Sequence, residues 1–286
     1  MKLFILGLGY SALYFARTRR AAFSRIGGAV RGEDKALALR AEGIGALRFD
    51  DPRVADEIED ANVLLMSIPP QDGGDPALAR FGAPLVQSRA KTLIYLSTIG
   101  VYGDHGGAWI DEDAALRPSS ARNAARAGAE RGWLALGTAQ RQAHVLRLAG
   151  LYGPGQNQLV KLREGRAQRI VKPGQVFNRI HVEDIARAVE AAARAPRGGV
   201  WNVADDEPAP PQDVLVFAAG LIGVPPPPPI DFATAELSAM ARGFYGDNKR
   251  VSNARLKNGL GVKLAFPTYR EGLRALAQAE PVTPPA

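Results

Sequence analysis

The sequence has no cysteine, and only three of its 286 residues are histidine and three methionine. Without cysteine it forms no disulfide, no thiolate nucleophile and no cysteine-ligated metal site, which fits a reducing cytoplasm. It also lacks any apolar run near the roughly 20 residues that a membrane-spanning helix needs. The apolar start of the chain is short and runs into a glycine-rich turn, which predicts a buried strand and not a signal peptide. We therefore expect a cytoplasmic protein without a membrane partner.

Hydrophobic residues make up 46% of the chain and charged residues 23%, which is ordinary for a globular protein that can bury a full core. The net charge is +7, carried by scattered arginines that are densest between residues 117 and 147. These arginines form either a solvated surface or a surface for an anionic cofactor or substrate. No basic stripe is interleaved with aromatic residues, so we expect no nucleic-acid partner.

Short apolar runs alternate with helical segments up to residue 148, and one more run follows near residue 200. The runs lie at 2–6, 28–30, 46–49, 63–68, 92–97, 144–148 and 200–203. Helices are expected at 11–20 and at 33–41, the second with Leu37 and Ala41 on one face, and again near 213–221. Strands that alternate with helices predict an α/β protein with a parallel sheet. Residues 225–229 are all proline and predict a stiff loop, and the tail at 281–286 is expected to be disordered.

A glycine-rich turn joins the first strand to the first helix and fits the pattern G-x-G-x-x-A. The first glycine permits the tight turn, the second lets the backbone approach a pyrophosphate, and the small last residue lets the helix pack on the strand. The helix N-terminus then faces the phosphates. This pattern predicts dinucleotide binding in a Rossmann-type doubly wound parallel sheet, through Gly7, Gly9, Tyr10, Ser11 and Ala12.

The residues after the next strands bear on which dinucleotide is bound. Arg31 ends the second strand, where an arginine can pair with the 2′-phosphate of NADP, so the sequence predicts NADP. NAD stays open because Glu33, two residues further on, can reach a ribose hydroxyl instead. Asp50 ends the third strand and either bonds the adenine or is a solvent-exposed turn residue. Ser67 and Pro69 follow the fourth strand at the ligand edge.

Several motifs together resemble the extended or atypical short-chain dehydrogenase/reductase superfamily, in its NAD-dependent epimerase/dehydratase group. They are the glycine-rich turn, the run Leu-Ile-Tyr-Leu-Ser-Thr-Ile-Gly-Val-Tyr-Gly at 93–103, Pro118 with Glu130, and residues 147–155, 181–184 and 201–204. The resemblance spans nearly the whole chain. It implies a dinucleotide-binding domain of residues 1–150 plus about 176–204. A smaller, discontinuous substrate lobe would take about 151–175 plus 205–286.

The resemblance also implies a mechanism, and the sequence departs from it. The family uses a Tyr as proton carrier, a Lys that lowers the tyrosine pKa and binds the ribose, and a Ser or Thr that orients the substrate oxygen. By spacing, Thr98 matches the Ser/Thr, while Arg122 stands at the Tyr position and Arg126 at the Lys position. Arg126 can still donate to ribose hydroxyls. A guanidinium holds its proton at neutral pH, so Arg122 cannot act as a general acid or base.

Three interpretations of this departure stay open. The proton can come from another group after a strand at the ligand edge, namely Tyr102, Tyr152 or His105. Arg122 can instead grip a carboxylate or phosphate of the substrate. Finally, Arg122, Arg126 and Glu130 can be a plain helix face with pairing between residues four apart.

Further along, Tyr152 lies in the turn that enters the substrate lobe, and Arg179 and Arg250 are candidates for contact with an anionic substrate. A helix is expected to start near residue 182, with Asp184 as its cap. His181 before it is interpreted as structural rather than catalytic.

The sequence thus favours an NAD(P)-dependent oxidoreductase or epimerase/dehydratase-like enzyme that acts on a small, anionic or sugar-related substrate. The alternative is a catalytically degenerate NADP-binding sensor, which the loss of the Tyr and Lys supports. An RNA-binding offshoot rests on the positive charge alone and would require affinity that falls steeply with salt. A homodimer through the helix at 120–137 is left open.

Overall fold

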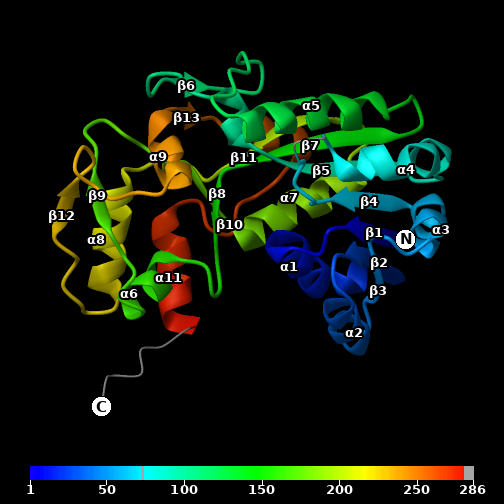
Figure 1. The fold of residues 1–286 in the computed structure, drawn as a ribbon, viewed down its shortest axis with the longest axis horizontal. Helices are drawn as coiled ribbons and strands as arrows, with labels where there is room; N and C mark the ends of the chain where they lie inside the picture. The colour runs from blue at the N-terminus through cyan, green and yellow to red at the C-terminus, as the bar shows by residue number, and fades with distance from the viewer. Residues whose placement is uncertain (72–73, 280–286) are drawn as a thin grey trace.

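The computed structural model describes residues 1–71 and 74–279. Its centre is a seven-stranded parallel sheet with the order β11-β7-β5-β4-β1-β2-β3. The strand order reverses at β1 (Figure 1). Strands β2 and β3 lie on one side of β1 in the sheet, and β4, β5, β7 and β11 lie on its other side. The strands are β1 (Lys2–Leu6), β2 (Arg25–Val30), β3 (Gly45–Arg48), β4 (Val63–Met66), β5 (Thr92–Thr98), β7 (Gln142–Leu148) and β11 (Gly199–Val203). The predicted Rossmann-type doubly wound sheet is confirmed.

Helices cover both faces of this sheet, which explains why its strands read as continuous apolar runs. In β1, Leu3 and Ile5 face one core and Phe4 and Leu6 the other. The first core is closed by α1 (Tyr10–Thr18), α2 (Glu33–Ala41), α7 (Val182–Arg194) and α10 (Ala254–Leu260). The second is closed by α3 (Arg53–Asp60), α4 (Pro76–Gln87) and α5 (Ala121–Ala135).

The remaining elements lie beyond the carboxyl ends of the sheet strands (Figure 1). Three small parallel pairs are β8 (Gly150–Tyr152) with β10 (Arg179–His181), β9 (Arg169–Val171) with β12 (Pro229–Asp231), and β6 (Trp109–Ile110) with β13 (Arg250–Val251). The helices here are α6 (Gln158–Arg163), α8 (Pro211–Leu221), α9 (Ala239–Gly246) and α11 (Tyr269–Ala279). The division into two lobes stays a prediction, although β10 pairs outside the large sheet.

Some local expectations differ from the structure. Helix α2 has the predicted bounds, but Leu37 is exposed and the buried residues are Ala36 and Leu39. The proline run is not loop throughout, because Pro229 begins β12. The tail at 281–286 lies outside the described residues. Within residues 1–71 and 74–279, no helix is both long and apolar enough to cross a bilayer.

Candidate functional site

The glycine-rich turn between β1 and α1 is built for close approach of a ligand. Gly7 has φ of 96°, and a Cβ there would lie 2.7 Å from the Ile68 side chain, so only glycine fits. Gly9 precedes α1, whose first turn has no side-chain cap and no acidic residue. No side-chain cap therefore competes with an anion at the N-terminus of the helix, and the positive end of the helix dipole favours one.

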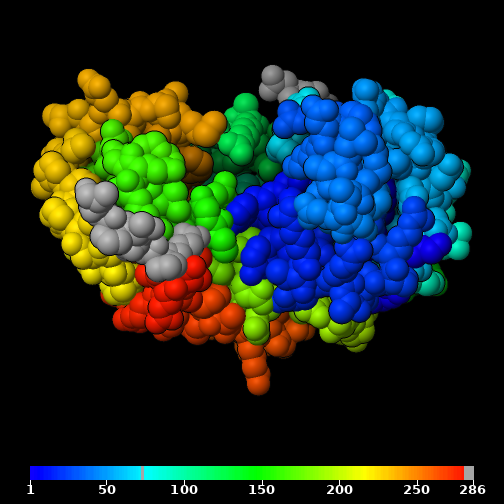
Figure 2. Space-filling view, turned by 90° about the horizontal axis from the view of Figure 1, so that it is seen from below, coloured from blue at the N-terminus to red at the C-terminus, as the bar shows by residue number. Residues whose placement is uncertain are grey.

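Neighbouring residues support this turn. Ser67 follows β4, and its Oγ lies 3.8 Å from the position that a Gly9 Cβ would take. Ala12 of α1 is fully buried, as its packing role requires, and Tyr10 donates from its hydroxyl to the Pro154 carbonyl at 3.0 Å. Pro69 lies exposed after Ser67. Figure 2 shows the surface hollowed between the blue N-terminal elements and the green segments of the other part of the molecule.

One basic residue of this region was missed in the sequence. The Lys35 ammonium of α2 donates to the Leu8 carbonyl at 2.7 Å and so lies beside the glycine-rich turn. Its only sequence signal is its position five residues after the second strand, and that position does not specify a contact with the first turn.

Arg31, Glu33 and Asp50, the residues expected near the adenosine of the dinucleotide, differ in whether a protein group already pairs with them. Arg31 is exposed and has no hydrogen-bond or ion-pair partner among the described residues. Glu33 is paired with Arg40. Asp50 is exposed and accepts from Arg48 Nε at 2.9 Å, which favours the surface-turn interpretation of this residue. Its role toward adenine stays a prediction.

The carboxyl end of β5 gathers the candidate catalytic residues. Thr98 is half-buried, and its Oγ1 accepts from the Gly100 N–H at 3.1 Å, which leaves its own proton free to donate. The first turn of α5 covers this point, because a Cβ on Gly100 would lie 2.8 Å from Asn123 Oδ1. Arg126, on the same helix, donates from Nη1 to the Leu96 carbonyl at 2.8 Å.

Arg122 is held very differently from Arg126. It is exposed, and its Nη1 lies 3.9 Å from the sulfur of Met240 on α9. The described residues place no carboxylate against it. A guanidinium without an anionic partner is suited to bind a carboxylate or phosphate in two-point fashion.

The interpretation of a plain helix face with Arg126–Glu130 pairing is wrong. Glu130 is buried and accepts from Ser97 Oγ at 2.5 Å and from Arg147 Nη2 at 2.8 Å. It therefore fixes α5 to β5 and β7 and has no bond to Arg126. Its partners lie 33 and 17 residues away, so the helical spacing gave no sign of them.

Tyr102 is not placed to carry a proton to a substrate, which corrects one of the three candidates. The side chain is fully buried, donates to Asn202 Oδ1 at 2.7 Å and accepts from Arg147 Nη1 at 2.8 Å. Burial raises the pKa of its hydroxyl to about 12. Tyr102 thus ties η2 (Ile99–Tyr102) to β11 and stays protonated at neutral pH.

Tyr152 and Arg179 are also enclosed, so neither is placed to meet a substrate. A Cβ on Gly272 would lie 2.1 Å from the Tyr152 hydroxyl, and burial raises the pKa of that hydroxyl. Arg179 is buried and donates from Nη1 to the carbonyls of Phe177 at 2.9 Å and Ala209 at 3.1 Å. Both residues support the packing between β8, β10 and α11.

His105 is the remaining candidate proton carrier, and it lies half-buried in the loop 103–107. Its Nε2 is 3.2 Å from the Tyr102 carbonyl. The same loop is tied to β13 and to the segment before it, because Arg250 of β13 donates to the Gly107 carbonyl and the His105 N–H donates to the Asn248 carbonyl at 3.0 Å. Arg250 therefore holds the loop, and its predicted contact with a substrate would be secondary to that bond.

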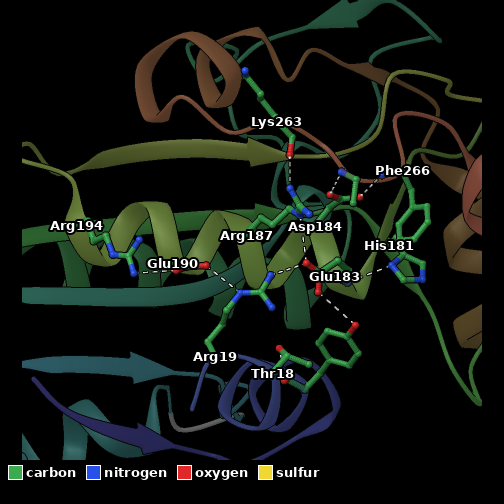
Figure 3. Close-up of polar contacts among 12 residues, drawn as sticks. Thr18, Arg19, His181, Glu183, Asp184, Arg187, Glu190, Arg194, Lys263 and Phe266 are labelled. Carbon is green, nitrogen blue, oxygen red and sulfur yellow. Dashed lines mark hydrogen bonds and ion pairs between the residues drawn. The ribbon is translucent and has the colours of Figure 1, made fainter. Parts of the chain in front are cut away.

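The start of α7 corrects the expected cap. His181 is the N-cap, since its Nδ1 accepts from the Glu183 N–H at 3.1 Å (Figure 3). Burial lowers the pKa of His181 to about 4, so it is neutral and structural, as expected. Asp184 instead accepts from the Ala265 and Phe266 N–H groups, at 2.5 and 3.1 Å. Figure 3 also shows Arg19, the residue after α1, joined to Glu183.

The fold and its ligand edge define a Rossmann-type protein, and residues 83–204 match the NAD dependent epimerase/dehydratase family. A functionally unknown conserved protein from Silicibacter pomeroyi DSS is 46% identical, with a TM-score of 0.88 over 98% of this chain and 99% of that one. The chain belongs to the same family as that protein.

Two further likenesses cover most of the chain. Protein YeeZ of Escherichia coli (strain K12) is 29% identical over 288 residues, which are 93% of this chain and 96% of that protein. The structure of MoeE5 in complex with UDP-glucose and NAD has a TM-score of 0.76 at 21% identity, over 97% of this chain and 98% of that chain. At that identity the likeness shows the shared fold.

Proposed function

We propose that this protein is an NADP-dependent oxidoreductase or epimerase/dehydratase-like enzyme that acts on a small anionic substrate. The observation that carries the proposal is the uncapped N-terminus of α1 beside Gly7, at the same sheet edge as Thr98. A dinucleotide whose pyrophosphate sits on that helix end lies across the carboxyl ends of the strands, where this fold binds its ligands. MoeE5, which shares the fold, binds NAD and UDP-glucose.

Preference for NADP rests on the charges after β2. Arg31 is a free, exposed cation, whereas Glu33 is engaged by Arg40. A 2′-phosphate would give Arg31 the anion that it lacks, and bidentate pairing of this kind is charge-assisted. A ribose with a free 2′-hydroxyl would have to compete with Arg40 for the Glu33 carboxylate.

The chemistry at the end of β5 follows from the same contacts. Reduction of a carbonyl takes a hydride, which a bound NADPH supplies, and a proton that must reach the oxygen. The Thr98 hydroxyl would donate a hydrogen bond to that oxygen and orient it, and Arg126 has remaining N–H groups for ribose hydroxyls. Arg122 would hold an anionic group of the substrate. His105, half-buried in the loop 103–107, is the remaining candidate to supply the proton.

A second candidate function is a catalytically inactive NADP-binding sensor. It is favoured by the two arginines at the Tyr and Lys positions and by the burial of Tyr102 and Tyr152. Both functions need the cofactor, and only the enzyme needs turnover.

Calorimetric titration with NADPH and then NADH tests the shared part of the proposal. We expect NADPH to bind with micromolar or better affinity and NADH to bind more weakly. Hydride exchange with a panel of carboxylate-bearing aldehydes and ketones then separates the enzyme from the sensor. Failure to bind either dinucleotide would overturn both functions.

A further inference from the structure

Helix α9 presents two large apolar side chains to solvent on one face. Met240 is 63% exposed and Phe244 is 60% exposed, and residues four apart in a helix are neighbours. The opposite face is anchored, because Tyr245 is buried with its ring 5.0 Å from Phe177 and 5.1 Å from Phe232. The helix is therefore held in place with its apolar face free.

This apolar face lies against the unpaired cation of α5. The Arg122 guanidinium contacts the Met240 sulfur at 3.9 Å, and no carboxylate of the described residues neutralises it. Arg122 and Met240 are 118 residues apart and come from different parts of the fold (Figure 1). A positive group thus stands next to an apolar surface.

Hydrogen bonds just after α9 tie the helix to the loop 103–107. Two residues after the helix, the Asn248 N–H donates to Asp104 Oδ1 at 2.8 Å, and the Asn248 carbonyl accepts from the His105 and Gly107 N–H groups, both at 3.0 Å. The loop 103–107 directly follows the turn that begins at Thr98. The apolar face and the candidate catalytic corner are therefore linked through a short, hydrogen-bonded connection.

We propose that Arg122, Met240 and Phe244 form a specificity subsite for a substrate that carries a carboxylate next to an aromatic or other apolar group. The inference rests on the proposed function and names its substrate class. Arg122 would bind the carboxylate, while the thioether and the phenyl ring would cover the apolar part, as methionine and aromatic side chains do well. Two side chains are too few for a stable protein interface, which takes about 800 Å² per partner, so the occupant is a small molecule.

Matched ligands test the subsite on the NADPH-loaded protein. The probe is 3-phenylpropionate, compared by calorimetry with 3-phenylpropionamide, which lacks the charge, and with propionate, which lacks the ring. We expect 3-phenylpropionate to bind about tenfold more tightly than either, a difference of about 1.4 kcal/mol in binding free energy. Arg122→Ala should abolish the preference over the amide. The double change Met240→Ser, Phe244→Ser should abolish the preference over propionate.

The control is Val86→Ser, which removes an equally exposed apolar side chain on α4 and should leave all affinities unchanged. Equal affinity for the three probes would overturn the inference, as would no binding of 3-phenylpropionate up to about 10 mM, beyond the weak end of specific affinities. The inference would also be overturned if UDP-glucose bound more tightly than 3-phenylpropionate and with the same affinity in the Met240→Ser, Phe244→Ser variant. It would equally be overturned if sedimentation showed a wild-type dimer that Phe244→Ser converts to a monomer.

Failure of this inference differs from failure of the proposed function. Suppose that NADPH binds and that Arg122→Ala weakens the binding of 3-phenylpropionate, while the double change at α9 leaves its affinity unchanged. Then only the apolar part of the subsite is wrong. If NADPH does not bind, the proposed function fails, and titration of the unloaded protein with the three probes still decides whether the subsite exists.

Discussion

Two arginines one turn apart on α5 are held for different tasks. Arg126 is fixed by the Leu96 carbonyl and lies with its guanidinium carbon 5.9 Å from the Tyr95 ring centre. Among the described residues, the polar contact of Arg122 is with the Met240 thioether. Arg126 is held in place by one nitrogen and keeps its other N–H groups for a ribose, whereas Arg122 has no protein oxygen to bond among the described residues and is ready for an anion. The same residue type at neighbouring turns therefore points to two roles.

Arg122→Ala is expected to weaken binding of an anionic substrate about tenfold to a hundredfold, because one charge-assisted hydrogen-bonded pair is worth roughly 1.5–3 kcal/mol. NADPH affinity should not change. The measurement is the dissociation constant, or KM where turnover is found, for a carboxylate ligand and its amide. Arg131→Ala on the exposed side of the same helix is the control, and an equal loss in both variants would reduce Arg122 to general surface charge.

Arg31→Ala tests the choice of cofactor. Removing the free cation should lower NADPH affinity by about tenfold, or about 1.4 kcal/mol, and leave NADH affinity unchanged, because only the former carries the 2′-phosphate. Titration of both dinucleotides against wild type and variant gives the answer. Wild-type affinity for NADH equal to that for NADPH, or a parallel loss of both in the variant, would refute the assigned role of Arg31.

At the scale of elements, the loop 103–107 is locked to the segment before β13. Gly103 has φ of 67°, and a Cβ there would lie 1.7 Å from the Arg117 carbonyl, so the loop begins at a position that excludes other residues. Asn248 then holds the loop by its backbone and the segment 174–176 by its side chain, through Val176 N–H at 3.2 Å and the Gly174 carbonyl at 3.0 Å. One asparagine thus joins three segments.

Asn248→Ala should remove the two side-chain hydrogen bonds to Val176 and Gly174 and keep the backbone hydrogen bonds to the loop 103–107. Loss of two hydrogen bonds is expected to lower the free energy of unfolding by about 1–3 kcal/mol. Urea unfolding measures the change, with Asn248→Asp as the partner variant, since it keeps the acceptor for Val176 and loses only the donor to Gly174. We expect the aspartate variant to be intermediate. Two variants as stable as wild type would show that the junction does not depend on this side chain.

The elements that the sequence predicted well are those with local signals. Strand β4 is apolar at every position, and β1 at every position after Lys2, because both faces of the sheet are covered. The glycine pattern is contiguous in sequence. The missed features depend on distant partners. Tyr102 bonds Asn202, 100 residues away, and Asp184 caps the backbone at 265 and 266 instead of its own helix. A polar residue after a strand predicts a ligand-edge position, but only the fold shows whether it is enclosed.

At the scale of the whole molecule, burial of ionisable groups sets how stability depends on pH. Burial lowers the pKa of His144 and of His181 to about 4. Each stays neutral in the fold, so its contribution is present above the unfolded pKa of about 6.5 and is lost as pH falls toward 4. These two residues therefore lower the free energy of unfolding as the pH falls below about 6.5.

Asp205 changes the stability in the opposite direction, because its contribution falls as the pH rises toward 8. It is 2% exposed, its Oδ2 has no partner among the described residues, and burial raises its pKa to about 8, against an opposing effect of Arg179. In the unfolded chain the pKa is about 3.9. Between these values the folded protein binds a proton that the unfolded chain does not, so the stabilising contribution is lost as pH rises through about 8.

Asp205→Asn should remove this loss. Between pH 6.5 and 8 the contribution of Asp205 to wild-type stability falls by up to about 1.4 kcal/mol per pH unit, since one proton is involved. The asparagine cannot ionise, so with rising pH its free energy of unfolding should fall less, or rise more, than that of wild type. His144 and His181, which titrate near pH 6.5 in the unfolded chain, affect wild type and variant equally and cancel in the comparison. Urea unfolding at three pH values measures the slopes, with exposed Asp56→Asn as the control. Equal slopes in wild type and Asp205→Asn would mean that the carboxyl is already ionised in the fold, with Arg179 outweighing burial.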